Sequence, residues 1–390
     1  MHIIIFTHPT FINSQSMPRY AHMLEAGMKK RGNTVELWSA SPLFFKLPFP
    51  AVMKKWLGYI DQFVVFPLQL KRKLKKCDEN NLFVFSDHAL GPWVPLVADR
   101  KHVIHCHDFL AQQSALGEIK ENKVSFSGRM YQMYIRWGYR KGKNFISISK
   151  KTQADLHHLL GSIPAFSEVV YNGLNQQFSA SDPEAVRQTL QKEFCMDVSN
   201  GYILHVGGNQ FYKNRKGVLK IYTAWRNINK IGLPLLMIGE EPTEELKQLK
   251  INSLFDTDIY FHTTVNDAIL QLAYQGATLL LFPSLAEGFG WPIAEAMASG
   301  CPVITTNEAP MTEVGGNAAY YISKRPTDNI VLEKWATDSA IVVNKLVELS
   351  KNERQKLIDL SIENAKRFDT KKALDQMEEI YKTVLEKVQR

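Results

Sequence analysis

Residues 283–303 place two carboxylates around a glycine-rich turn. Glu287 stands directly before Gly288-Phe289-Gly290, and Glu295 follows eight positions after Glu287. The apolar run before the turn predicts a buried strand, and open α/β sheets bind ligands at the carboxyl ends of their strands. Pro292 suits the first turn of a helix. We therefore expect Glu287 on the loop and Glu295 in the first helical turn, both facing one small volume. A lone Glu295 could instead be explained by the helix dipole, worth about 0.3–1 kcal/mol.

A second glycine turn opens the second half of the chain. Gly207 and Gly208 follow a predicted strand and lead towards a helix, and a helix N-terminus binds anions readily. Arg215 and Lys216 add fixed positive charge at this point. A solvated basic turn is the alternative, but the expected position opposite the glutamate loop favours a phosphate site. The turn contains neither a dinucleotide fingerprint nor a P-loop.

The glutamate segment resembles the signature of the retaining glycosyltransferases of family 4, which have two glutamates around Gly-Phe-Gly and then Glu-Ala-Met-Ala-x-Gly-x-Pro-Val. The resemblance implies the GT-B fold, an α/β architecture of two Rossmann-like domains with parallel sheets facing a central cleft. It also implies that Glu295 accepts from the ribose hydroxyls of a nucleotide sugar. Glu287, with the amides of Gly288, Phe289 and Gly290, would hold hydroxyls of the transferred sugar. A carboxylate suits such roles because it can accept from two vicinal hydroxyls at once.

The same family usually has Val-Gly, a basic residue and then Lys-Gly or Lys-Asn in the second turn. Counting back from Ala224-Trp225 favours Lys216-Gly217 as this pair, with Arg215 beside it. Lys213-Asn214 is the second choice. Such cations would stabilise the charge that develops on a leaving phosphate.

The first half of the chain offers a histidine and a serine. His105-Cys106-His107-Asp108 ends a predicted strand, and His107 resembles the histidine that family members place near the donor sugar. A buried histidine at a strand end is an equally good interpretation of His107. After the first strand the family commonly has a glycine pair, where this chain has Asn13-Ser14-Gln15-Ser16-Met17. Ser14 or Ser16 could cap the helix and contact the diphosphate.

Two features could suggest a metal, and neither is persuasive. His105 and His107 share one face of a strand, but no third ligand has suitable spacing. Asp256-Thr257-Asp258 matches the string by which another glycosyltransferase fold binds manganese. It precedes a predicted strand at the end away from the ligand side, so a turn is the better interpretation. We expect transfer without a metal and no cofactor beyond the donor substrate.

Strand-like and helix-like segments alternate in both halves of the chain, as parallel α/β sheets require. The pattern predicts an N-terminal acceptor-binding domain over residues 1–178 and a C-terminal nucleotide-sugar domain over 179–369. A helix over 370–390 is expected to pack back on the N-terminal domain. After an opening strand and a helix over 17–31, the expected strands are 35–38, 82–86, 103–107, 145–149, 169–171, 202–206, 235–238, 259–261, 278–282 and 303–305.

The net charge of +8 needs an anionic partner, and the sequence shows no nucleic-acid module. Residues 54–76 and 129–141 mix basic and aromatic side chains. Both stretches suit a surface that meets anionic membrane or a lipid-linked diphosphate acceptor. Ordinary amphipathic helices with solvated lysines are the alternative. The start of the chain resembles no signal peptide, no apolar run could span a bilayer, and the four cysteines form no Cys-x-x-Cys pair. We expect a cytoplasmic protein, at most peripheral at the inner face of the membrane.

The resemblance thus implies a retaining glycosyltransferase of polysaccharide biosynthesis. It would move a hexose-type sugar from a nucleoside-diphosphate sugar to a glycan or lipid-linked saccharide. The alternatives are a GT-B sugar-nucleotide epimerase or phosphorylase, and a non-catalytic protein that binds nucleotide or nucleic acid.

Overall fold

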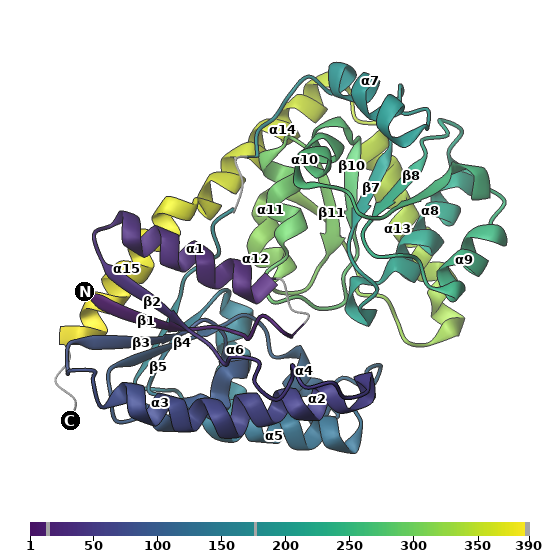
Figure 1. The fold of residues 1–390 in the computed structure, drawn as a ribbon. Helices are drawn as coiled ribbons and strands as arrows, with labels where there is room; N and C mark the ends of the chain where they lie inside the picture. The colour runs from purple at the N-terminus through teal and green to yellow at the C-terminus, as the bar shows by residue number, and fades with distance from the viewer. Residues whose placement is uncertain (13–15, 175–177, 387–390) are drawn as a thin grey trace. The chain divides into compact units, whose positions relative to one another are not determined.

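The computed structural model describes residues 1–12, 16–174 and 178–386. It divides into two compact units (Figure 1). The first unit comprises Met1–Asn175 and Thr370–Arg390, and the second comprises Gln176–Asp369. Each unit is a parallel sheet with helices on both faces, and each is described separately.

The sheet of the first unit has the strand order β2-β1-β3-β4-β5-β6, and all neighbours are parallel. Strands β3 and β4 are buried along their whole length, because helices cover both faces and leave no side that could be polar. Strand β6 begins three residues earlier than expected, since this half-exposed edge strand lacks the apolar run that marks the others. The strands are β1 (His2–Phe6), β2 (Thr34–Trp38), β3 (Asn81–Phe85), β4 (His102–Cys106), β5 (Asn144–Ser147) and β6 (Phe166–Val169).

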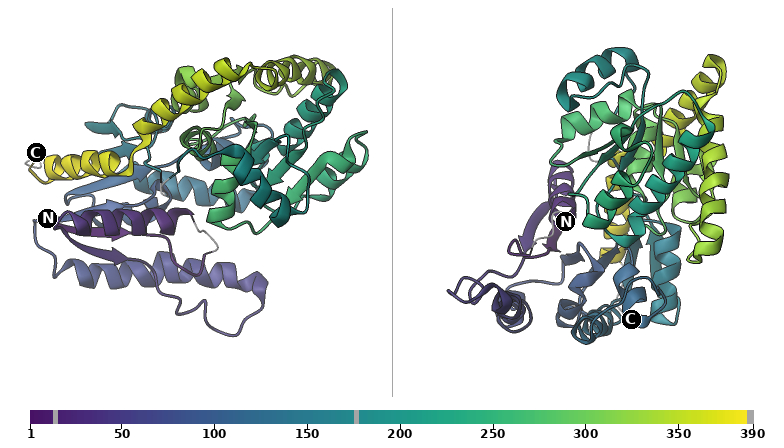
Figure 2. Two further views of the ribbon diagram at one scale, coloured as in Figure 1. Left: turned by 90° about the horizontal axis from the view of Figure 1, so that it is seen from above. Right: turned by 90° about the vertical axis from the view of Figure 1, so that its right-hand side faces the viewer.

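Helices α1 and α15 cover one face of this sheet, and α15 comes from the far end of the sequence. His105 of β4 joins them, with Nδ1 2.9 Å from the Tyr20 hydroxyl of α1 and Nε2 2.7 Å from the Tyr381 hydroxyl of α15. Figures 1 and 2 show the two helices side by side, and a Cβ on Gly27 of α1 would meet the Leu374 side chain of α15 at 2.6 Å. The helical segments of this unit are α1 (Ser16–Lys30), α2 (Ala51–Ile60), the π-turn η1 (Asp61–Val65), α3 (Phe66–Leu74), the 3₁₀ segment η2 (His88–Leu96), α4 (Leu110–Leu116), α5 (Phe126–Tyr139), α6 (Lys150–Leu160) and α15 (Thr370–Glu386).

The sheet of the second unit has the order β12-β11-β10-β7-β8-β9, again with parallel neighbours. Strand β12 was not expected from the sequence, because it is mostly half-exposed. The strands are β7 (Ile203–Val206), β8 (Leu235–Ile238), β9 (Ile259–His262), β10 (Leu279–Phe282), β11 (Val303–Thr306) and β12 (Ala319–Ile322). The helices are α7 (Pro183–Phe194), α8 (Arg215–Ile228), α9 (Glu244–Ile251), α10 (Asp267–Gly276), α11 (Trp291–Ala298), α12 (Met311–Gly315), α13 (Asn329–Val347) and α14 (Lys351–Ala365).

The predicted fold class, two α/β units with parallel sheets, is confirmed. The cleft expected between them stays a prediction. Among the described residues, no helix has the length and apolarity that a membrane span requires.

Helix α5 packs on η2 with its backbone in direct contact. A Cβ on Gly138 would lie 2.0 Å from the carbonyl oxygen of Gly91, and a Cβ on Gly91 would lie 2.2 Å from the carbonyl oxygen of Ile135. Both glycines are buried. Since the obstructing atoms belong to backbone, neither contact can relax by a rotamer change.

We expect Gly138→Ala to lower the free energy of unfolding by about 1–3 kcal/mol, the usual cost of overpacking. Gly128→Ala in the first turn of the same helix is the comparison, because its Cβ would meet side-chain atoms, Val124 Cγ1 at 2.7 Å and Ser125 Oγ at 3.3 Å, and no backbone. Since side chains can shift where backbone cannot, this variant should lose less stability than Gly138→Ala. Urea unfolding measures both variants, and equal stability of the two would contradict the packing argument.

Candidate active site

The loops after β7 and β10 are joined at the carboxyl edge of the second sheet. The backbone N–H of Leu285 donates to the carbonyl oxygen of Tyr212 at 2.7 Å. Asn214 Nδ2 donates to the carbonyl oxygen of Pro283 at 2.8 Å, from a left-handed backbone conformation with φ of 52°. The loops meet because β7 and β10 are neighbours in the sheet. They therefore form one surface, built from segments far apart in the sequence.

An ion pair lies at this junction. Lys213 Nζ is 2.8 and 3.0 Å from the two carboxylate oxygens of Glu287, although the residues are 74 apart in the sequence. The side chains are only 17% and 8% exposed. The ammonium also lies 5.4 Å from the ring centroid of Phe282. The site thus presents one cation and one carboxylate, both largely shielded from water.

The structure corrects the choice of lysine. Lys216 is half-exposed and its ammonium is ion-paired with Glu245 of α9, so its expected place beside Glu287 is wrong. The reason is where the helix begins. Lys216 is the second residue of α8, whereas Lys213 lies in the 3₁₀ turn η3 (Phe211–Lys213) that precedes the helix and contacts the β10 loop. The second choice of the sequence, Lys213-Asn214, is the pair that meets the glutamate loop.

Arg215 lies at the glycine turn after β7, where the sequence placed it, but not beside Glu287. It is 4% exposed, and its guanidinium donates to the side-chain oxygen of Asn209 and to the carbonyl oxygen of Glu240, the latter at 2.9 Å. Its guanidinium carbon lies 5.4 Å from the ring centroid of Phe261 in β9. Arg215 therefore ties the glycine turn after β7 to the ends of β8 and β9, and it makes no bond to the carboxylate of Glu287.

Glu295 lies close to the ion pair but in a different turn of helix from the one expected. Helix α11 begins at Trp291, so Glu295 is in its second turn, where its Oε2 accepts from the Tyr274 hydroxyl at 2.8 Å. Burial raises the pKa of Glu295 to about 7, against the hydrogen bond from Tyr274 and the positive charge of Lys213, which both lower this pKa. Near neutral pH the carboxyl group is therefore close to the midpoint of its titration.

The turn between the two glutamates is held by an aromatic anchor. Phe289 is 2% exposed and packs edge-on against Trp291 and Phe368, with ring centroids 5.4 and 5.3 Å away. Gly290 has φ of 103°, a left-handed conformation that side chains rarely adopt, directly before α11. The buried ring fixes the turn, so Phe289 could contribute to a ligand only through its backbone.

The glycine turn after β7 lies against the side chains of Gln210 and Glu240. A Cβ on Gly208 would lie 2.6 Å from Gln210 Oε1 and 2.9 Å from Glu240 Oε1. The backbone N–H of Gly207 already donates to the carbonyl oxygen of Ile238 at 3.0 Å. The Glu240 carboxylate accepts from the Asn209 N–H at 2.9 Å, so this turn carries negative as well as positive charge.

Two candidates belong to the first unit. His107 is buried at the end of β4, and its Nε2 carries a proton, because it lies 2.9 Å from the carbonyl oxygen of Ser86. Burial lowers the pKa of His107, so the ring is neutral. Ser16 is exposed as the first residue of α1. Ser14, the other serine considered, lies outside the described residues.

The string at residues 256–258 forms the three-residue turn η4 (Asp256–Asp258), which leads into β9. Asp258 is ion-paired with Arg226 of α8. In the described part of the chain, no three His, Cys, Asp or Glu side chains are grouped as metal ligands would be.

Two family models match this chain. The model of glycosyl transferases group 1 matches residues 200–346, which include Lys213, Glu287 and Glu295. The model of glycosyltransferase family 4 matches residues 17–178, which include His107. The chain belongs to the family 4 glycosyltransferases.

Relatives of this glycosyltransferase include two bacterial proteins. The O-antigen chain mannosyltransferase B of Escherichia coli is 32% identical over 144 residues, 36% of this chain and 38% of that protein. The O-antigen chain mannosyltransferase RfbU of Salmonella typhimurium is 25% identical over 201 residues, 51% of this chain and 52% of that protein. The chain therefore spans about half or less of the length of these relatives.

Solved structures agree with the fold. The structure of Anabaena Alr3699/HepE in complex with UDP and glucose has a TM-score of 0.72 at 15% identity, covering 98% of this chain and 100% of that one. Sucrose-phosphate synthase from Thermosynechococcus elongatus also has a TM-score of 0.72 at 15% identity, with 98% of each chain covered. At this level of identity the likeness establishes the GT-B fold alone.

The glycosyltransferase has one polar cluster that the sequence motifs did not reveal. His8 follows β1 and Asp87-His88 follows β3, neighbouring strands whose carboxyl ends lie together. His8 Nε2 is 2.9 Å and His88 Nδ1 3.0 Å from the Asp87 carboxylate. Burial alone would raise the pKa of Asp87, but the charges of His88 and His8 and their hydrogen bonds lower it well below its ordinary value. One indication of this cluster is visible in the sequence, since all three residues come just after predicted strands.

We expect the stability of the glycosyltransferase to depend on pH through Glu295. Its pKa is about 7 in the folded protein and 4.5 ordinarily, so the folded state binds more protons between these values and is destabilised as pH rises through them. Glu295→Gln removes this titration. Relative to wild type, the variant should gain about 1–3 kcal/mol in unfolding free energy between about pH 5 and pH 8.

Urea unfolding at the two pH values measures the difference. Glu244→Gln, a substitution at an exposed carboxylate on α9, is the control and should show no such trend. A Glu295→Gln difference that is the same at both pH values would contradict the assigned environment of Glu295.

Proposed function

We propose that this chain transfers a hexosyl group, with mannosyl as the first candidate, from a nucleoside-diphosphate sugar to a glycan or lipid-linked saccharide. Transfer proceeds with retention and without a metal. The observation that carries the proposal is the shielded pair Lys213–Glu287, held beside Glu295 at the carboxyl edge of the second sheet. Two relatives named as O-antigen mannosyltransferases support the choice of sugar and of acceptor class.

In this proposal the ion pair is divided by the donor. The diphosphate takes the ammonium of Lys213, and Glu287 becomes free to accept hydrogen bonds from hydroxyls of the sugar. Lys213 exchanges one anionic partner for another, and Glu287 exchanges the ammonium for hydrogen bonds from neutral hydroxyls, so neither buried group is left without a partner. On the family resemblance, the backbone of Gly288, Phe289 and Gly290 would contact the same sugar. The binding site is therefore organised before the donor arrives.

Cleavage of the bond between sugar and diphosphate builds negative charge on the leaving phosphate. Lys213 then gains more from the transition state than from the ground state, which is the condition for catalysis. The acceptor hydroxyl attacks on the face that the phosphate leaves and gives its proton to the departing phosphate oxygen, so the new bond forms with retention of configuration. No side chain is assigned as a covalent nucleophile.

Glu295 takes the ribose hydroxyls in this proposal. Its hydrogen bond with Tyr274 orients the carboxyl group, and the ionised form accepts most strongly. His107 and Ser16 of the first unit stay in the proposal on the family resemblance, near the sugar and the diphosphate respectively. The neutral His107 would act as a hydrogen-bond partner and not as a cation.

A donor screen tests the proposal. GDP, UDP and ADP are compared by thermal shift, followed by transfer assays with GDP-mannose and UDP-glucose with and without EDTA. One nucleoside diphosphate should raise Tm, and transfer from its sugar should survive EDTA. If none of the three raises Tm, the nucleotide-sugar proposal fails. Activity that EDTA abolishes and a divalent cation restores would contradict transfer without a metal.

The two lysines provide a sharper test. Lys213→Met keeps most of the length of the side chain and removes its charge. It should therefore lower kcat by about 10²- to 10³-fold, the usual effect of removing one preorganised donor. Lys216→Met is the control, since its half-exposed ion pair with Glu245 contributes little, and kcat should stay within about threefold. A large effect of Lys216→Met with a small effect of Lys213→Met would return the phosphate role to Lys216.

Loss of stability must be separated from loss of chemistry in this test. Lys213→Met leaves the Glu287 carboxylate shielded and unpaired. The double variant Lys213→Met/Glu287→Gln removes both charges and should recover the Tm while remaining inactive. Recovery of activity along with the Tm would show that the pair is only structural.

A further inference from the structure

The continuous helical segment from α2 to α3 has an apolar stripe on its outer side. The stripe residues recur every fourth position, while Leu57, Phe66 and Leu70 on the inner side are buried in the core. Such a stripe on the solvent side of a helix has no role in the core of this unit. Its members are Val52, Trp56, Ile60, Val64 and Leu68, which are between 36% and 83% exposed.

Helix α5 extends this surface. Tyr59 of α2 stacks on Tyr131 of α5 with ring centroids 5.3 Å apart, and Phe63 of η1 packs edge-on against Tyr134 at 5.5 Å. Figure 1 shows α2, α3 and α5 together on one side of the first sheet. Helix α5 carries its own exposed apolar residues, Phe126, Met130, Met133 and Trp137. We call the outer surface of α2, η1, α3 and α5 the aromatic face.

The aromatic face carries charge of one sign. Residues 51–76 contain seven Lys and Arg but one acid, Asp61, which is buried and accepts from the backbone N–H of Phe44 and Phe45 at 2.9 Å. Residues 122–154 contain no acid at all. A partner that fits this face must therefore offer both an apolar region and negative charge.

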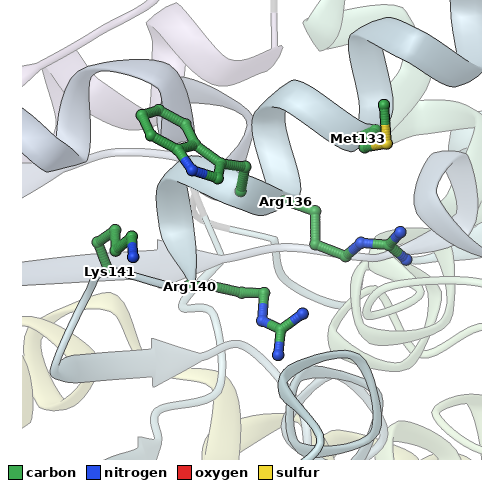
Figure 3. A pocket seen from close by; sticks show the side chains of 5 residues that line it. Met133, Arg136, Arg140 and Lys141 are labelled. Carbon is green, nitrogen blue, oxygen red and sulfur yellow. The ribbon is translucent and has the colours of Figure 1, made fainter.

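A hollow of about 470 Å³ lies beside the C-terminal end of α5 (Figure 3). Arg136, Arg140 and Lys141 line it together with Met133 and Trp137. Arg140 donates to the carbonyl oxygen of Leu160 at 3.3 Å. No carboxylate is ion-paired with any of the three cations within the described ranges of the chain. Three uncompensated cations around one hollow suit the phosphate of a head group.

Two tryptophans are exposed on this same surface. Trp56 and Trp137 are 58% and 50% exposed and both belong to the aromatic face, whereas Trp38, Trp93 and Trp225 are at most 6% exposed. Tryptophan is enriched at the level of lipid head groups, where its ring meets both apolar and polar surroundings. Exposed tryptophan beside an apolar stripe and lysines is the pattern of a helix that lies in a membrane interface.

We propose that the aromatic face docks on an anionic phospholipid bilayer, with head-group phosphates at Arg136, Arg140 and Lys141 and with Trp56 and Trp137 in the interfacial layer. A second copy of the chain is a poorer occupant, because a two-fold contact would set this basic face against itself. Nucleic acid is also poorer, since its phosphate backbone offers nothing to the aliphatic part of the stripe. The inference goes beyond the transfer reaction and does not depend on it.

Vesicle sedimentation tests the docking surface. The full chain should sediment with vesicles of phosphatidylcholine mixed with phosphatidylglycerol, not with phosphatidylcholine alone, and less at high salt. The variant Arg136→Gln/Arg140→Gln/Lys141→Gln should bind roughly a hundredfold more weakly, about fivefold for each charge. Lys192→Gln/Lys351→Gln/Lys356→Gln removes the same charge from exposed sites of the second unit and should bind as wild type does.

Trp56→Phe/Trp137→Phe provides an independent measurement. The tryptophan fluorescence of wild type should shift to shorter wavelength on addition of the anionic vesicles, and the double variant should lose that shift. Nucleotide-induced thermal shifts, unchanged in every variant, would show that the fold and the donor site are intact. A wild type that ignores anionic vesicles overturns the proposal, as does equal binding by the two triple variants. A concentration-dependent dimer that buries Trp56 and Trp137 also overturns it, in favour of a second copy.

Discussion

The adjacency of β7 and β10 is the constraint on which the rest of the site depends. It sets two loops side by side that the sequence separates, and it lets Lys213 reach Glu287 across them. The left-handed Asn214 then bonds to Pro283, and a Cβ on Gly217 would lie 2.4 Å from the Asn214 amide nitrogen. The glycine in the first turn of α8 is thus needed for the loop that carries the cation. The position of the Lys213 charge, the conformation of the loop at Asn214 and the start of α8 therefore depend on one another.

The buried titratable groups of the two units divide into structural and chemical ones. His105 and His205 are fully buried, and burial lowers both pKa values to about 3, so these rings act as neutral hydrogen-bonding groups. Glu295 is different, because its pKa of about 7 lies close to physiological pH. Its charge state therefore responds to whatever binds nearby, and a cationic or hydroxyl-rich ligand would favour the ionised form.

The sequence predicted the strands well where they are buried on both faces, because an apolar run is then unavoidable. It failed at edges such as β12, where partial exposure removes that signal. In the site, the positions of Glu287 and the glycines followed from a strand-to-helix turn, whereas the helix turn of Glu295 did not, since the pattern does not fix the first residue of a helix. For the same reason the sequence favoured Lys216 over Lys213, since it does not show that α8 begins after Lys213. The cluster of Asp87 with His8 and His88 forms because β1 and β3 are neighbours in the sheet. Local sequence does not determine the order of strands, so this cluster could not be predicted.

Helix α15 has a consequence for the order in which the units are completed. Leu374, Met377, Tyr381 and Val384 are part of the core that covers one face of the first sheet, yet they follow every residue of the second unit in the chain. The first unit is therefore interrupted by the second. On the ribosome, the second unit has its whole complement of strands and helices while the first still lacks one wall of its core. Translation thus completes the second unit first, and the unit that begins the chain becomes whole last.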